Sequence, residues 1–183
     1  MGIYIYEVHS EVNGVRWEEV MERYTCKLKT IQIKVSDPVE DTRLTGPEDA
    51  VVLLRSIYDE LLDDDQEHFV VLFLGAGRRG VVTGFKVLFS GAQACILTDV
   101  KVIFRNALLF GATAIVLAHN HPSGDLEPNE ADVSITKRCV EAGRLLGIQV
   151  LDHIIISPTG WISLKRKERR LFQPSVIDLM IGW

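Results

Sequence analysis

The chain has 183 residues, enough for one domain with a sizeable hydrophobic core and a further appendage. Apolar residues make up 47% of the sequence, charged residues make up 25% and the net charge is −5, which is ordinary for a soluble globular protein and argues against sequence-independent binding to nucleic acid. The three cysteines, Cys26, Cys95 and Cys139, lie far apart without CxxC spacing, so they indicate neither a disulfide framework nor a cysteine zinc site.

The N-terminal region carries few structural signals. Its first residues, MGIYIYEVHSEVNG, are acidic where a secretory signal peptide is basic, and apolar runs elsewhere are much shorter than the roughly 20 residues of a membrane span. We therefore expect a soluble protein of the reducing cytoplasm. Residues 27–35, KLKTIQIKV, are rich in β-branched side chains and predict a strand.

A polar connector at 36–46, which contains a proline, predicts the boundary before the main domain. This boundary divides the chain into an N-terminal extension of unknown role at 1–44, a domain at 45–170 and a C-terminal tail at 171–183. The sequence shows no internal repeat and no low-complexity tract.

Residues 45–65, TGPEDAVVLLRSIYDELLDDD, predict a helix, because Pro47 stands near the start, acidic residues follow in the first turn and apolar residues recur at a helical spacing. Residues 67–91, EHFVVLFLGAGRRGVVTGFKVLFSG, predict two strands joined by a Gly-rich turn. Strands flank the GAGRRG segment on both sides, so we interpret it as a hairpin turn rather than a phosphate-binding loop.

Helical character returns at 98–111, TDVKVIFRNALLFG, with Thr98 or Asp99 as the N-cap. The run ATAIVLA at 112–118 is short and continuously apolar, which predicts a strand buried on both faces. Residues 129–147 predict another helix, and residues 148–164 predict a second hairpin. Strand pairs with helices between them indicate an α/β (α+β) domain in which helices flank one mixed β-sheet.

The segment LAHNHPSGDLEPNEAD, residues 117–132, contains a candidate metal site. Strand residues two apart point to the same side, so His119 and His121 can reach one ion. A turn-rich loop follows and can bring Asp132, in the first turn of the next helix, beside them. Two histidines and one carboxylate with an open position suit Zn²⁺, which activates water near neutral pH.

Here the sequence resembles a known family. The motifs AHNHPSGD and EAGRLLGIQVLDHIII, with the aspartate at the helix start between them, look like the RadC family of JAB/MPN metalloprotease-like domains over about residues 45 to 170. The resemblance implies a JAB/MPN sandwich of the cytidine-deaminase-like type. It also implies a zinc-dependent hydrolase of amide bonds, with Zn²⁺ on His119, His121 and Asp132.

The family pattern also contains a glutamate that opens a strand, and EHFVVLFLGAG supplies Glu67 at the matching place. The resemblance implies that Glu67 holds the attacking water, acts as general base and then protonates the leaving amine. Without the family, the favoured interpretation of Glu67 is a solvated residue at a helix end.

One position departs from the family pattern: Asn129 stands where the family has a serine that stabilises the oxyanion. The amide of Asn129 could donate a hydrogen bond in place of that serine, although asparagine is also an ordinary N-cap. Ser123 is a second candidate donor, with turn stabilisation as its alternative role. The departure puts peptidase activity in more doubt than metal binding.

Other polar residues near these motifs have simpler interpretations. Asp125, Glu127 and Glu130 are interpreted as solubilising residues of the loop and the first helical turn. His153, beside Asp152 in LDHIII, is interpreted as a hydrogen-bonded core or interface histidine, with a place behind the metal ligands as the alternative.

The basic stretch KRKERR at 165–170 is interpreted as a solvated face rather than a phosphate-contacting patch. Trp161, Trp183 and the tail segment VIDLMIGW either pack on the core or form a self-association surface, which leaves a homo-oligomer open.

The leading functional hypothesis is a zinc-dependent hydrolase whose partner is a peptide or protein substrate. The alternatives are a metal-retaining module that binds protein without efficient catalysis, and a DNA-repair protein, which is the label that RadC relatives commonly carry. We weight direct DNA binding low, because the net charge is negative and the helix-hairpin-helix region that usually precedes the domain is replaced by residues 1–44.

Overall fold

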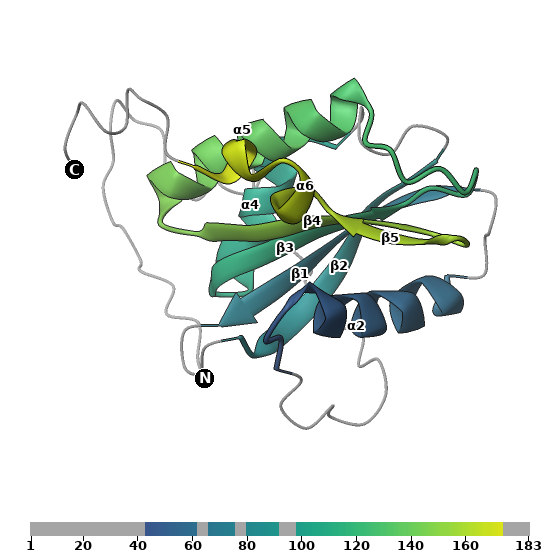
Figure 1. The fold of residues 1–183 in the computed structure, drawn as a ribbon. Helices are drawn as coiled ribbons and strands as arrows, with labels where there is room; N and C mark the ends of the chain where they lie inside the picture. Colours follow the sequence, from purple (N-terminus) through teal and green to yellow (C-terminus); the bar gives the residue numbers. More distant parts are fainter. Residues whose placement is uncertain (1–42, 62–65, 76–79, 92–97, 174–183) are drawn as a thin grey trace, which may run out of the picture. The chain divides into compact units, whose positions relative to one another are not determined.

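The computed structural model describes residues 43–61, 66–75, 80–91 and 98–173. Their main elements are, in chain order, α2 (Pro47–Glu60), β1 (Glu67–Gly75), β2 (Val82–Gly91), α4 (Val100–Leu109), β3 (Ala112–Asn120), α5 (Glu130–Leu146), β4 (Gln149–Ser157), β5 (Gly160–Ser163), α6 (Leu164–Lys167) and the 3₁₀ helix η1 (Arg169–Phe172). They form a five-stranded mixed sheet flanked by helices (Figure 1), as the sequence predicts. The strand predicted at 27–35 lies outside the described residues.

The strand order in the sheet is β2-β1-β3-β4-β5. β1 pairs antiparallel with β2 and with β3, β3 pairs parallel with β4, and β4 pairs antiparallel with β5. Both predicted hairpins are therefore confirmed, and α5 makes the crossover that a parallel pair requires. The register places His119 opposite Phe69 on one side and Ile155 on the other, near the centre of the sheet.

Helix α2 covers one face of the sheet, which we call the α2 face (Figure 1). Its buried residues are Ala50, Val51, Leu54 and Ile57. The strands pack against them with the apolar side chains of Val70, Leu72, Leu74, Val116, Ala118, Ile154 and Ile156. These side chains form a hydrophobic core, and burial of its apolar area is its main stabilising contribution.

Helices α4 and α5 cover the opposite face, which we call the α5 face. Phe69, Phe73 and Leu117 of the strands pack there against Ile103 and other apolar residues of the two helices. Cys139 of α5 is also buried here, and its burial raises the pKa of the thiol to about 12. The thiol is therefore a packing group.

Local signals explain where the helices begin and end. Asp99 caps α4 by accepting a hydrogen bond from the backbone N–H of Lys101, at 2.9 Å. Helix α5 ends at Gly147, whose φ of 68° lies in the left-handed region that favours glycine. Strand β3 runs two residues further than the predicted 112–118, so His119 is part of the sheet. No described helix is long and apolar enough to cross a membrane.

Candidate metal centre

The end of β3 positions the two histidines of the HNHP motif. His119 is held inside the sheet and is completely buried, and its ring stacks on that of Phe69. His121 follows the strand, and its backbone N–H donates to the carbonyl of Ile156 at 2.8 Å. This geometry brings the two Nε2 atoms to 2.9 Å of one another. The predicted convergence of the imidazoles is present.

The first turn of α5 supplies the carboxylate. Asp132 is completely buried, with Oδ1 at 3.2 Å from Nε2 of His119 and Oδ2 at 3.7 Å from Nε2 of His121. Oδ2 also accepts a hydrogen bond from the backbone N–H of Asn129, whose side chain in turn caps the helix, so a capping box fixes the carboxylate. The three side chains could hold a metal ion.

The loop between the histidines and α5 is tied to the sheet, and it orients His121. Gly124 has a φ of 86°, a conformation that side-chain-bearing residues rarely adopt, and its carbonyl accepts a hydrogen bond from Oγ1 of Thr159. Nδ1 of His121 lies 2.9 Å from the carbonyl oxygen of Asp125. Because a carbonyl only accepts, Nδ1 carries the hydrogen, and Nε2 of the neutral ring keeps its lone pair.

The donor set fits a divalent cation. A tetrahedral zinc ion with ligands at about 2.05 Å separates its ligand atoms by roughly 3.3 Å. The Nε2–Nε2 distance of 2.9 Å and the carboxylate distances of 3.2 and 3.7 Å scatter around that value. A carboxylate and an imidazole lone pair facing each other in a buried site are acceptors only, and a cation between them removes their repulsion.

Glu67 opens β1 at the same end of the sheet. Phe69 of β1 pairs with His119 of β3, and the two strands are antiparallel. Two residues before Phe69 and two residues after His119 therefore lie at the same end of the sheet, and these residues are Glu67 and His121. Glu67 therefore shares the face on which Phe69 and His119 lie. It is half-buried and begins a strand, so the alternative interpretation as a solvated helix end is wrong.

Asn120, which the sequence interpretation did not single out, holds the backbone on both sides of Glu67. Its Oδ1 accepts a hydrogen bond from the backbone N–H of His68 at 2.6 Å, and its Nδ2 donates to the carbonyl of Gln66 at 2.9 Å. Its place in the sequence between His119 and His121 was the signal that could have identified it. The carboxamide continues the pairing of β1 and β3 by one step and fixes the position of Glu67.

His153 and Thr136 lie directly behind the candidate ligands. His153, on β4, is completely buried, and its Nε2 lies 2.9 Å from Nδ1 of His119. It is thus a hydrogen-bonded core histidine, as favoured, and also the partner of a candidate ligand, which was the alternative. Burial, and after it the nearby His119 ring, hold the pKa of His153 well below its ordinary value of 6.5. Thr136 was missed, although it lies one helical turn after Asp132.

The two candidate oxyanion donors occupy local structural roles. Oδ1 of Asn129 accepts hydrogen bonds from the backbone N–H groups of Ala131 and Asp132, at 2.8 and 3.0 Å, so Asn129 is an N-cap. Ser123 is exposed in the loop, where its Oγ accepts from the N–H of Asp125 at 3.4 Å. Their catalytic roles stay predictions.

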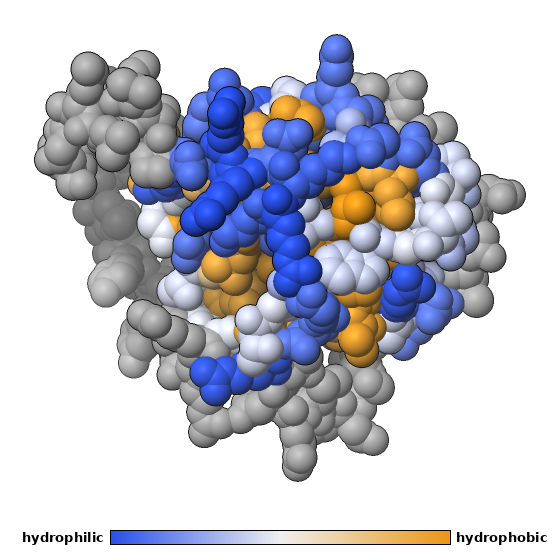
Figure 2. Space-filling model, viewed as in Figure 1, coloured by the Kyte–Doolittle hydropathy of each residue, from blue (hydrophilic) through white to orange (hydrophobic). Residues whose placement is uncertain are grey.

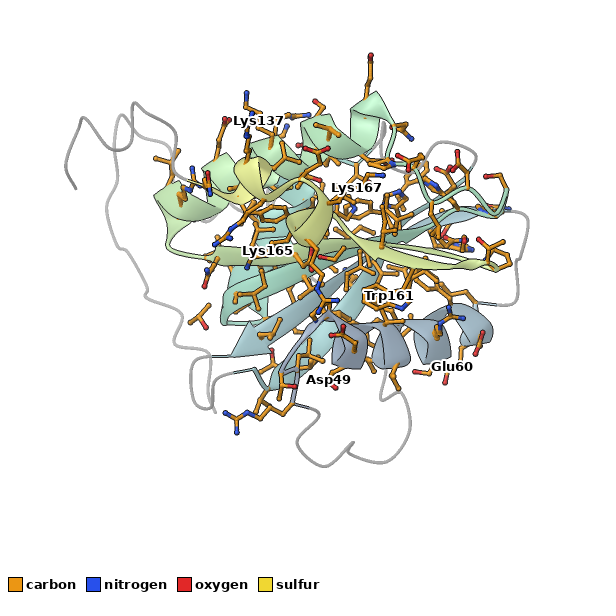
Figure 3. The ribbon with its side chains drawn as sticks, viewed as in Figure 1. Asp49, Glu60, Lys137, Trp161, Lys165 and Lys167 are labelled. Atoms are coloured by element: carbon orange, nitrogen blue, oxygen red, sulfur yellow. The ribbon has the colours of Figure 1, made fainter. Side chains whose placement is uncertain are left out.

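The basic stretch at 165–170 is exposed, as the sequence interpretation favoured, and forms α6 and the start of η1. Arg166 binds both carboxylate oxygens of Glu48 on α2, and Lys167 pairs with Glu127 of the loop beside His121. Figure 3 shows Lys165 and Lys167 on α6 and Lys137 on α5, and the surface over these helices is largely hydrophilic (Figure 2).

Buried Asp152, next to His153, anchors this C-terminal segment to β4. Its carboxylate accepts hydrogen bonds from Oγ of Ser163 and from the backbone N–H of Lys165, at 2.5 and 3.0 Å.

Comparison with known proteins places this geometry in a family. A model of the RadC-like JAB domain matches residues 44–170. Similar proteins include the UPF0758 protein TTE0897 of Caldanaerobacter subterraneus subsp. tengcongensis, 38% identical over 74% of this chain and 56% of the relative, and a UPF0758 protein of Clostridium botulinum, 39% identical over 69% of this chain and 53% of the relative. The chain spans about half the length of the curated relatives it matches.

Proposed function

Because the chain belongs to the family of RadC-like JAB domains, we propose that it is a zinc-dependent hydrolase that cleaves amide bonds in peptides or isopeptides. The observation that carries the proposal is the buried convergence of two imidazole nitrogens and one carboxylate, from His119, His121 and Asp132. A buried set of this composition is costly to maintain without a cation, and it matches the ligands of catalytic zinc.

In this proposal the metal ligands hold the ion, and Glu67 transfers the proton. A Zn²⁺ ion on the three side chains would supply a Lewis acid that polarises the substrate carbonyl and lowers the pKa of water. Glu67 accepts a proton from the attacking water as the new carbon–oxygen bond forms. It then delivers this proton to the amide nitrogen, which leaves with the electron pair of the broken carbon–nitrogen bond. Two observations support this role: Glu67 lies on the α5 face two residues before Phe69, the strand partner of His119, and Asn120 clamps the backbone around it.

Asn129 is the proposed donor to the oxyanion that develops on the substrate carbonyl. Its Oδ1 is committed to the start of α5, and the Nδ2 amide of the same group can still donate away from the helix. Ser123, in the exposed turn of the loop, is the second proposed donor. The substrate is a peptide or protein that reaches the site past this loop.

The commitment of Asn129 to capping also favours a second candidate function, a module that keeps its metal and binds protein without efficient turnover. A carboxamide held by two backbone N–H groups adjusts less readily to a transition state than a free side chain does. The two functions share the metal site and differ in whether Glu67 takes part in chemistry.

Metal analysis tests the shared part of the proposal. Protein purified without a histidine tag is expected to hold about one zinc ion per chain, and His119→Ala is expected to lose it. The exposed Lys137→Ala on α5 is the control and should keep the metal. Wild-type protein that takes up no divalent metal would refute both functions.

An amide-cleavage assay separates the two functions. The probes are quenched fluorescent peptides of mixed sequence and a peptide joined to lysine by an isopeptide bond. Glu67→Gln should keep its zinc and lose turnover by about 10²–10⁴-fold, the usual contribution of a general base. Glu60→Gln, at the exposed end of α2, is the matched control and should cleave like wild type. Equal rates for Glu67→Gln and wild type would contradict the hydrolase.

A further inference from the structure

We propose that His153 and Thr136 are positioning residues that hold His119 in the single tautomer whose Nε2 can bind the metal. This inference rests on the metal site of the proposed function and adds to it a second layer of residues. Both side chains are completely buried, they lie on different elements, β4 and α5, and neither belongs to the candidate ligand set.

The first step concerns the hydroxyl of Thr136. Its Oγ1 lies 2.5 Å from the backbone carbonyl of Asp132, one turn earlier in α5, and 2.6 Å from Nδ1 of His153. A hydroxyl has one hydrogen, and a carbonyl can only accept, so this hydrogen points to Asp132. Towards His153 the oxygen of Thr136 must accept, and Nδ1 of His153 must donate.

The position of the hydrogen on His153 determines its position on His119. His153 is completely buried, and burial disfavours a charged ring, so the ring carries one hydrogen, which the bond to Thr136 places on Nδ1. Its Nε2 is then an acceptor, and Nδ1 of His119, 2.9 Å away, is the donor. His119 therefore has no hydrogen on Nε2, the atom that faces His121 and Asp132.

The chain of hydrogen bonds matters because the competing tautomer is favourable. A free neutral histidine ring prefers its hydrogen on Nε2, and in this site such a hydrogen would point at Oδ1 of Asp132, 3.2 Å away. That arrangement would close the site with an internal hydrogen bond instead of a metal. The chain begins at the carbonyl of Asp132 itself, so it links one candidate ligand to another through His153 and Thr136.

Metal affinity tests the inference without any measurement of turnover. The probe is Zn²⁺, titrated in competition with a chromophoric chelator. His153→Leu removes the acceptor and is expected to weaken zinc binding by about 10–100-fold, the usual loss for the partner of a ligating histidine. His153→Gln keeps an acceptor at the ε position and should recover most of the affinity. His68→Gln is the control, because the buried ring of His68 bonds Ser90 and takes no part in the hydrogen bonds that join Asp132, Thr136, His153 and His119.

Thr136 offers a second, smaller test. Thr136→Val removes the acceptor for Nδ1 of His153 at nearly constant volume, and is expected to weaken zinc binding, whereas Thr136→Ser keeps the hydroxyl and should bind like wild type. Urea unfolding of each variant shows that the comparison is made between folded proteins.

Nitrogen NMR of histidine-labelled, metal-free protein reads the tautomer directly. Nε2 of His119 should show the shift of a nitrogen without hydrogen in wild type and in His153→Gln, and move towards that of a protonated nitrogen in His153→Leu. A merely structural role would leave this shift unchanged.

A wild-type Nε2 that carries hydrogen, or a folded His153→Leu with wild-type affinity, would overturn the inference. Wild-type protein without zinc affinity would instead refute the proposed function, and the NMR result would still decide the tautomer.

Discussion

The two faces of the sheet differ in the polar side chains that they bury. On the α2 face Val70, Ala118 and Ile156 pack beneath α2, and the buried carboxylate of Asp152 bonds to the C-terminal segment that it anchors. On the α5 face the same strands change from Leu117 to His119, and the buried side chains become polar. One sheet thus carries a hydrophobic layer beneath α2 on one side and, on the other, a buried cluster of histidines with Asp132 and Thr136.

The difference shows how the fold tolerates buried polar groups. His153 and Thr136, the polar side chains behind the candidate ligands, hydrogen-bond to each other, and His153 also bonds His119. Backbone carbonyls provide the remaining partners: that of Asp132 for Thr136 and that of Asp125 for His121. Burial of such groups is costly unless they are paired, so these hydrogen bonds offset the cost of placing the cluster next to the hydrophobic core of the α5 face. The following predictions test the difference between the two faces, from the largest expected effect to the smallest.

In this comparison the largest effect on turnover is expected at the clamp on Glu67. Asn120→Leu removes the two bonds that hold the start of β1, and we expect turnover to fall by up to about 10²-fold while zinc is retained, because small displacements of a catalytic group are costly. Asn106→Leu, which alters a buried asparagine that bonds only within α4, is the matched control. Equal losses in both variants would point to general destabilisation.

The α2 face should respond in the opposite way. Leu54 of α2 is completely buried against the sheet, and Leu54→Ala is expected to cost about 2–5 kcal/mol of unfolding free energy through lost burial and a cavity. Urea unfolding measures this cost. The zinc content of the folded variant should equal that of wild type, and a loss of zinc would show that the two faces are coupled.

Metal removal should lower the stability of the whole domain and loosen the α5 face most. At free zinc about 100 times the dissociation constant, binding contributes roughly 2.7 kcal/mol, which a chelator would abolish. Amides that exchange through global unfolding should accelerate equally, and local opening should accelerate exchange further at the start of α5 and the end of β3. Acceleration spread evenly over the sheet would contradict a local site.

The smallest effect concerns the start of α2. The hydroxyl and the backbone N–H of Thr45 lower the pKa of Asp49 below its ordinary value of 3.8. A lowered carboxyl pKa contributes stability above that value, and the contribution is lost as the pH falls through the folded pKa. Melting temperatures of Asp49→Asn should therefore fall less steeply with acid than those of wild type, and Thr45→Val, which keeps the backbone donor, should lie between the two.

The sequence predicted those parts of the molecule that depend on local pattern. Helix caps such as Asp99 and Asn129, both hairpins and the three candidate ligands follow from spacing along the chain. Neighbours across the sheet do not. The contact of His153 with His119 depends on the parallel pairing of β3 with β4, and that of Asn120 with β1 depends on where the ladder ends.

The short separation of the three candidate ligands has a consequence for the order of assembly. His119, His121 and Asp132 belong to one strand–loop–helix unit, and closing a loop of this size costs little chain entropy. Glu67 comes from a distant strand that joins only when β1 pairs with β3. During folding, the three ligands of the proposed metal site can therefore come together before the pairing of β1 with β3 brings Glu67 to them.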